Sequence, residues 1–140
     1  MANATIRITG VPLDKITPQI EKALDDALAG TLNLQQGKLA KACPKDTGRM
    51  ASSFFVGQNQ PVTESRDENW AQPGDARLEI DQYDGKITFE GDWYISNAVP
   101  YAEYVAYNYK PSAKAQKDWY TSIANQSGNV FKAQYDKVKP

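Results

Sequence analysis

Histidine is absent from this sequence of 140 residues, and cysteine occurs once, at Cys43. Without histidine the chain lacks the commonest general base and the usual zinc ligand, which excludes Ser-His and Cys-His nucleophilic mechanisms. A single cysteine excludes an intramolecular disulfide and a cysteine-rich metal site. We therefore expect no catalytic residue, no metal site and no cofactor, and hence no enzyme.

Long apolar runs are also missing. No stretch approaches the ~20 consecutive apolar residues of a membrane span, and the first residues lack the basic and apolar regions of a signal peptide. The composition, 41% hydrophobic and 24% charged, is typical of one soluble domain with a single core. We expect one domain over residues 1–140 and no association with a membrane.

The net charge of −1 conceals an uneven distribution. Residues 64–84 contain two arginines and seven acidic residues, a net −5, whereas the segments before and after them are each +2. This stretch is either a solvated loop and strand surface or a surface that repels polyanions. The candidates for a polyanion-repelling surface are Glu64, Asp67, Glu68, Asp75, Glu79 and Asp81.

A long amphipathic helix is predicted in the first third of the chain. Thr17 offers an N-cap hydroxyl and Pro18 suits the first helical position, where its missing N–H costs nothing. Apolar residues then recur at intervals of three and four until Pro44 stops the helix. Gly30 and Gly37 each cost about 1 kcal/mol relative to alanine, which favours a bend or break at these positions.

Strands are predicted on both sides of a polar excursion. Thr5–Thr9 alternates in polarity and Phe54–Val56 is apolar, so both are expected to be strands. An excursion over residues 57–74 follows, and a loop of this length is typically functional or mobile. Residues 76–95 alternate around Asp84-Gly85, which favours an antiparallel hairpin with a type I′ turn. We expect Phe54–Val56 to be an edge strand that pairs with a neighbouring subunit.

Helical segments are predicted after the hairpin. Pro100 opens a short one, and Ser112 can cap a longer C-terminal helix that Ser127-Gly128 interrupts. Because the order of elements shows no βαβ alternation, the predicted fold class is α+β. In this fold the long N-terminal helix and the C-terminal helices pack on a small antiparallel sheet that contains the hairpin.

Two turn segments carry the most specific pattern. In the first, Asp46 or Thr47 can cap the following turn, Gly48 permits a tight backbone and Met50 packs inward. The first motif consists of Pro44, Asp46, Thr47, Gly48, Met50 and Ser53. The second motif consists of Asn97, Pro100, Tyr101, Ala102, Tyr104 and Val105. Each motif alone is explained as a rigid turn at the start of a helix.

Taken together and in this order, the long helix and the two motifs resemble the tail-completion, or tail-to-head joining, proteins of tailed bacteriophages. That family includes minor tail components, and the resemblance spans roughly residues 18–109. The family usually follows the second motif with Glu-x-Gly, where this chain has Ala106-Tyr107-Asn108-Tyr109. The excursion at 57–74 is also longer than is usual in the family.

The resemblance implies a structural virion protein without catalytic activity or cofactor, assembled in the cytoplasm of the bacterial host. Such proteins form a homo-oligomeric ring, commonly of six subunits, between the head connector and the tail tube or tail terminator. Double-stranded DNA passes through the ring without specific binding. Since phosphate contacts by Lys and Arg create affinity for DNA, we expect some of the acidic residues above to line the lumen or its rim.

Other functions fit parts of the sequence. Another phage neck or minor capsid protein would share the fold and have a different partner. A glycan-binding module would use exposed, coplanar Tyr or Trp side chains. A carboxylate-dependent hydrolase would need convergent acids, and Asp75 with Glu79 and Asp81 resembles the acids of a metal-dependent nuclease. The lysine which that nuclease pattern requires is replaced by Asp81.

Overall fold

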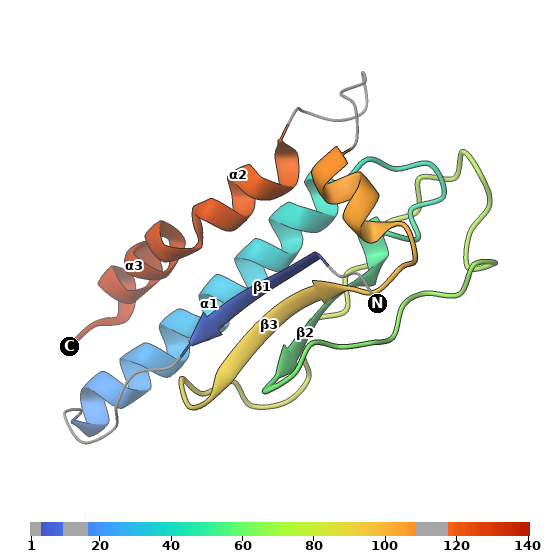
Figure 1. Ribbon diagram of the computed structural model, residues 1–140. Coiled ribbons are helices and arrows are strands. Elements are labelled where there is room, and N and C mark those ends of the chain that lie inside the picture. Colours follow the sequence, from blue (N-terminus) through green and yellow to red (C-terminus); the bar gives the residue numbers. More distant parts are fainter. Residues whose placement is uncertain (1–3, 10–16, 109–117) are drawn as a thin grey trace.

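A computed structural model describes residues 4–9, 17–108 and 118–140 of the chain (Figure 1). The fold is α+β, as predicted, with a long N-terminal helix, C-terminal helices and a three-stranded antiparallel sheet. In chain order the elements are β1 (Ala4–Thr9), α1 (Pro18–Ala42), the 3₁₀-helix η2 (Ala51–Ser53), β2 (Phe54–Gln58), β3 (Asp92–Asn97), the π-helix η3 (Tyr104–Asn108), α2 (Trp119–Asn125) and α3 (Ser127–Val138).

Helix α1 begins and ends where the sequence predicts. The Thr17 hydroxyl accepts a hydrogen bond from the Ile20 amide at 3.3 Å, and Pro18 is the first helical residue. The helix ends at Ala42, just before Pro44. It continues unbroken through Gly30 and Gly37, so the predicted break does not occur. Packing on both sides of the helix outweighs a propensity cost of about 1 kcal/mol per glycine.

The sheet has the order β1–β3–β2, and both neighbouring pairs are antiparallel. Ile95 on the central strand lies between Ile6 and Val56, which places three apolar side chains in one row. Both predicted strands, Thr5–Thr9 and Phe54–Val56, are therefore confirmed, and β2 is an edge strand as expected.

The predicted hairpin at 76–95 is wrong. Only residues 92–97 form a strand there, and residues 59–91 form one long irregular loop, so the excursion is longer than 57–74. The reason is that both edges of β3 are occupied by β1 and β2, which leaves no edge for a local partner. The Ala76 amide donates instead to the Asp46 carbonyl, and the Phe89 amide donates to the Asp25 carboxylate.

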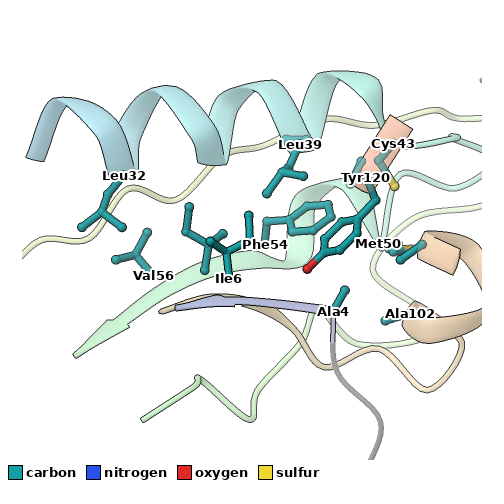
Figure 2. Close-up of a cluster of buried hydrophobic side chains, with 14 of the residues drawn as sticks. Ala4, Ile6, Leu32, Leu39, Cys43, Met50, Phe54, Val56, Ala102 and Tyr120 are labelled. Carbon is teal, nitrogen blue, oxygen red and sulfur yellow. The ribbon is translucent and has the colours of Figure 1, made fainter. Parts of the chain in front are cut away.

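The core lies between α1 and the sheet, and α1 lies between the sheet and the α2–α3 pair (Figure 1). Leu32 and Leu39 of α1 meet Phe54 and Val56 of β2 in this core (Figure 2). On the opposite side of α1, the side-chain amide of Gln35 donates to the Ile123 carbonyl at 2.8 Å. The helix is thus covered along two of its faces.

The C-terminal helices are separated at Gln126, one residue before the predicted interruption. The predicted cap at Ser112 lies outside the described residues. The short helical segment predicted after Pro100 is confirmed, because Ala102 and Glu103 are α-helical and lead directly into η3. No helix within residues 4–9, 17–108 and 118–140 combines the length and apolar character needed to cross a membrane.

Candidate functional site

The first motif begins where α1 ends. The Lys45 ammonium donates hydrogen bonds to the Lys41 carbonyl at 2.8 Å and to the Cys43 carbonyl at 2.9 Å, which satisfies carbonyls at the helix C-terminus. Partial burial lowers the pKa of Lys45. Cys43 is buried, and desolvation raises the pKa of its thiol to about 12, so it is an inert core residue.

Glycine is the only residue type that fits at position 48 of the first motif. Its φ is +91°, and a Cβ atom there would lie 1.7 Å from the Arg77 carbonyl oxygen. Arg77 is held close because its amide donates to the Thr47 carbonyl at 3.0 Å, next to the bond between Ala76 and Asp46 at 2.8 Å. The backbone of the 59–91 loop therefore packs on this turn.

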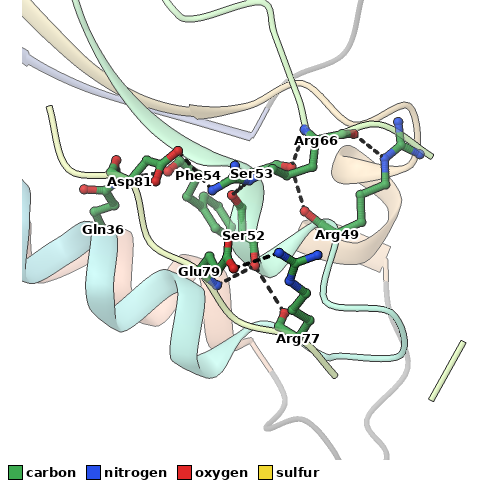
Figure 3. A network of polar contacts seen from close by, with 9 residues as sticks. All are labelled: Gln36, Arg49, Ser52, Ser53, Phe54, Arg66, Arg77, Glu79 and Asp81. Atoms are coloured by element: carbon green, nitrogen blue, oxygen red, sulfur yellow. Dashed lines mark hydrogen bonds and ion pairs between the residues drawn. The ribbon is translucent and has the colours of Figure 1, made fainter. Parts of the chain in front are cut away.

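Two consecutive serines hold two different stretches of this loop (Figure 3). The Ser52 hydroxyl donates to the Arg77 carbonyl at 3.2 Å and accepts from the Glu79 amide at 2.9 Å. The Ser53 hydroxyl donates to the Arg49 carbonyl at 2.6 Å and accepts from the Arg66 amide at 2.9 Å. Both serines are fully buried, so each hydroxyl replaces water for loop groups that would otherwise be unpaired.

The structure brings the second motif against the first. Asn97, at the end of β3, is fully buried, and its side-chain amide donates to the Met50 carbonyl at 2.8 Å. Its side-chain oxygen accepts from the Val99 amide at 3.3 Å, which shapes the turn that follows. The Arg49 guanidinium lies 5.9 Å from the centre of the Tyr101 ring. Residues separated by 47 positions in the sequence thus form one unit.

A pocket of about 400 Å³ lies between the two motifs. Its lining combines Pro44, Lys45, Asp46, Thr47, Gly48 and Met50 with Tyr101 and Val105. We call these residues the motif pocket. Several of its polar groups already bind the chain itself, as the Asp46 carboxylate does in accepting from the Gly74 amide at 2.9 Å.

The remaining motif residues divide between core and surface. Ala102 is fully buried, whereas Tyr104 is 58% exposed and Pro100 is exposed. Tyr101 is 40% exposed, and partial burial of its ring raises the pKa of its hydroxyl. The Val105 carbonyl accepts a hydrogen bond from the Trp119 indole at 3.3 Å, so α2 is attached to the second motif. Exposed tyrosines beside a pocket are typical of protein interfaces.

All six acidic candidates lie in the 59–91 loop with exposed side chains. Glu79 and Asp81 are paired with arginines, Glu79 with Arg77 at 2.8 Å and Asp81 with Arg66 at 3.0 Å. The hydrogen bond from Arg77 lowers the pKa of Glu79. The Asp75 carboxylate accepts a hydrogen bond from the backbone amide of Gln72. Within the part of the chain that the structure describes, no three His, Cys, Asp or Glu side chains gather as a metal site would require.

Sequence reasoning missed the centre of this loop. The guanidinium groups of Arg66 and Arg77 lie 5.1 and 4.0 Å from the centre of the Trp70 ring. The Arg66 side chain also donates to the Ser52 carbonyl at 3.1 Å. One pattern could have revealed the pair, because Arg66 and Arg77 are the only basic residues in the acidic stretch 64–84. Cations kept within an acidic segment indicate a structural role.

Comparison of the chain with protein-family models, with curated proteins and with solved structures found no match. The motif residues and their arrangement in the structure therefore carry the evidence on function. Of the twelve motif residues, those that line the motif pocket or are buried beside it come from both motifs. The six acidic residues do not converge on one point, since those with bonds to the chain have different partners.

Proposed function

We propose that this chain is a structural virion protein of a tailed bacteriophage, a tail-completion or neck component that forms a ring joining tail to head. The observation that carries the proposal is the meeting of the two motifs through Asn97 and Met50. Motifs that resemble a family by chance have no reason to be adjacent in space. Motifs that belong to one architecture are expected to meet, and these two share a buried hydrogen bond and a pocket.

The role of each motif residue also fits an assembly protein. Gly48 and Asn97 serve the backbone, since one admits the Arg77 carbonyl and the other binds the Met50 carbonyl. Tyr101 and Tyr104 remain exposed beside the motif pocket. We assign this surface to the contact with the head connector or with the tail-tube or tail-terminator protein, because tyrosine is enriched where proteins bind each other.

The passage of DNA gives the acidic loop its role in the proposal. Arg77 and Arg66 neutralise Glu79 and Asp81, so repulsion of phosphates falls mainly to the other four candidates. These four exposed residues are Glu64, which lines a cavity beside β2, and Asp67, Glu68 and Asp75, to which we assign the surface that faces DNA. A lumen or rim that carries them in every subunit would have a negative potential and would not retain DNA as it slides through.

A phage carrying a nonsense codon in this gene tests the proposal. In a non-suppressing host we expect heads filled with DNA and separate, complete tails in negative-stain micrographs, because only the joining step is lost. Supplying the chain from a plasmid restores joined, infectious particles. Joined and infectious particles without the protein would contradict the proposal. Heads that never fill would instead indicate a minor capsid or other neck protein.

A further inference from the structure

A cavity of about 990 Å³ extends along the outer edge of β2, away from the motif pocket. Its inner wall is the face of α1 that contains Asn33, Gly37 and Lys38, and Val56 of β2 lies at its floor. The opposite wall consists of the loop segments 62, 64–66 and 80–84. The Gln36 amide joins the walls by donating to the Phe54 carbonyl at 2.8 Å and to the Asp81 carbonyl at 2.7 Å. We call this cavity the edge groove.

Within the described residues no strand pairs with the outer edge of β2, and Val56 of this strand lines the edge groove. The Asn59 amide donates to the Asp92 carbonyl at 2.7 Å, which fixes the alternation of hydrogen bonds between β2 and β3. In an antiparallel pair every second residue points its N–H and C=O away from the neighbouring strand. Counting back from Asn59, these outward residues are Gln58, Val56 and Phe54; the Phe54 carbonyl already accepts from Gln36, and Val56 is the one of the three that lines the edge groove. An open edge of this kind accepts a further strand.

The two glycines of α1 have different surroundings. A Cβ at Gly30 would lie 2.5 Å from the Gln134 side-chain oxygen, so α3 explains that glycine within the chain. A Cβ at Gly37 would meet nothing within 4 Å. Glycine at an open position inside a helix costs about 1 kcal/mol relative to alanine. No close contact among the described residues at Gly37 offsets this cost. Close approach by another backbone over Gly37 supplies a reason for it.

The chemistry of the walls indicates what approaches. The Asn33 side-chain oxygen is buried with no hydrogen-bond partner among the described residues, and it suits an incoming N–H donor. Lys38 and Lys41 line the α1 wall, whereas Glu64 and Asp84 line the loop wall. A nucleic acid would be repelled by the acidic wall, but a polypeptide with both charges and a regular series of N–H and C=O groups matches all of these features.

We propose that a second copy of this chain inserts an extended segment into the edge groove and adds it to β2 as a fourth strand. The sheet order leaves β1 as the other edge, and by the same alternation Thr5 and Arg7 direct their backbone groups outward there. No strand among the described residues pairs with this edge of β1, so a second copy carries a matching edge on the opposite side of its sheet. Contact between two different edges is heterologous, and such a contact builds a ring when the rotation from one subunit to the next closes. The inference rests on the proposed function, because it supplies the contact between ring subunits.

Photo-crosslinking in phage-producing cells tests the occupant of the groove. Benzoylphenylalanine replaces Leu34, which lines the edge groove and is 40% exposed, or in the control Val138, which is 41% exposed on α3 and lines no part of it. We expect an adduct of twice the mass of the chain from position 34 and none from position 138. An adduct with a different protein, or none from position 34, would overturn the inference.

A second pair of variants tests the groove itself in the same assay. Gly37→Trp fills the groove, and Gly128→Trp adds equal bulk at a helical position that also has open space, outside the groove. We expect Gly37→Trp to lower the yield of the self-adduct about tenfold and Gly128→Trp to leave it unchanged. Equal yields from the two variants would overturn the inference. Thermal melting of both variants checks that each is folded.

Particle association, measured by sedimentation of the same cells' lysate, is read separately. A self-adduct from a chain that never joins particles would leave the groove contact standing and contradict the proposed function. Incorporation into particles without a self-adduct would support the proposed function and contradict the groove contact.

Discussion

The 44–53 turn and the 59–91 loop both lie between regular elements, but different forces fix their backbones. The turn is largely buried, with Met50 and Ser53 in the interior, and its path depends on a glycine that no other residue can replace. The loop is mostly exposed and buries few side chains, Phe89 among them. Its backbone is held by hydrogen bonds to the turn.

The difference shows that the dependence runs in one direction. The turn is supported by the core and by Asn97, whereas the loop is supported by the turn. Damage to the turn should therefore release the loop, and damage confined to the loop should leave the turn in place. The first motif thus holds in place the acidic surface that we assign to the lumen, although the motif residues themselves are not part of that surface.

Gly48→Ala should have the largest effect. Left-handed strain and the displacement of the Arg77 backbone together should lower the free energy of unfolding by at least about 3 kcal/mol. Gly74→Ala is the matched control, because Gly74 has a φ of +88° and open space, so only strain of about 1 kcal/mol is expected. Chemical denaturation of both variants measures the difference, and equal losses would show that the loop does not dock on Gly48.

Asn97→Ala should come next, with a loss of about 2–3 kcal/mol, because it leaves the buried Val99 amide without its acceptor and removes one of the two donors to the Met50 carbonyl, which keeps the Ser53 amide. The variant separates the two motifs while leaving every hydrogen bond between turn and loop in place. Denaturation with urea measures the loss. A change below about 0.5 kcal/mol would mean that the two motifs are adjacent without stabilising each other.

Ser52→Ala and Ser53→Ala should each lower stability by about 1–2 kcal/mol and should release different stretches of the loop. Ser52→Ala frees the backbone at Arg77, and Ser53→Ala frees it at Arg66. Limited digestion with trypsin should accelerate about five- to thirtyfold at Arg77 in the first variant and at Arg66 in the second. Acceleration at both sites in both variants would show that the loop opens as one unit.

Gly37→Ala should have the smallest effect on the isolated chain, a gain of about 0.5–1 kcal/mol, because the added methyl group meets no atom and the helix gains propensity. Gly30→Ala is the comparison within the same helix, where the Gln134 side chain must move aside. Thermal melting of the two variants gives the sign. A loss at Gly37 would mean that the chain itself needs this glycine.

Local sequence patterns predicted the features that depend only on residues close by in the sequence, such as helix ends and tight turns. The cap at Thr17, the end of α1 before Pro44 and the tight turn at Gly48 all follow from the chemistry of single positions. The hairpin failed because Asp84-Gly85 favours a local turn, while β1, some ninety positions earlier, takes the edge that the turn would have used. Short-range preference carries no information about such a competitor.

The site was predictable in its members but not in its connections. Both motifs were recognisable from the sequence, yet the Asn97–Met50 bond links positions 47 apart, which no spacing rule gives. The arginines that hold the loop were hidden inside a net negative charge. Their role depends on the Trp70 ring and the Ser52 carbonyl, which come into reach only when the loop is folded back on the turn.

The central claim, that the chain is a ring component of the phage neck, is tested most directly by a cryo-electron microscopy reconstruction of the virion. We predict density for this fold at the joint between head and tail, arranged as a ring around the DNA path. Asp67, Glu68 and Asp75 should face the lumen or its rim, and a neighbouring subunit should lie along β2. A virion without this density at the joint, or a chain located elsewhere in the particle, would contradict the account.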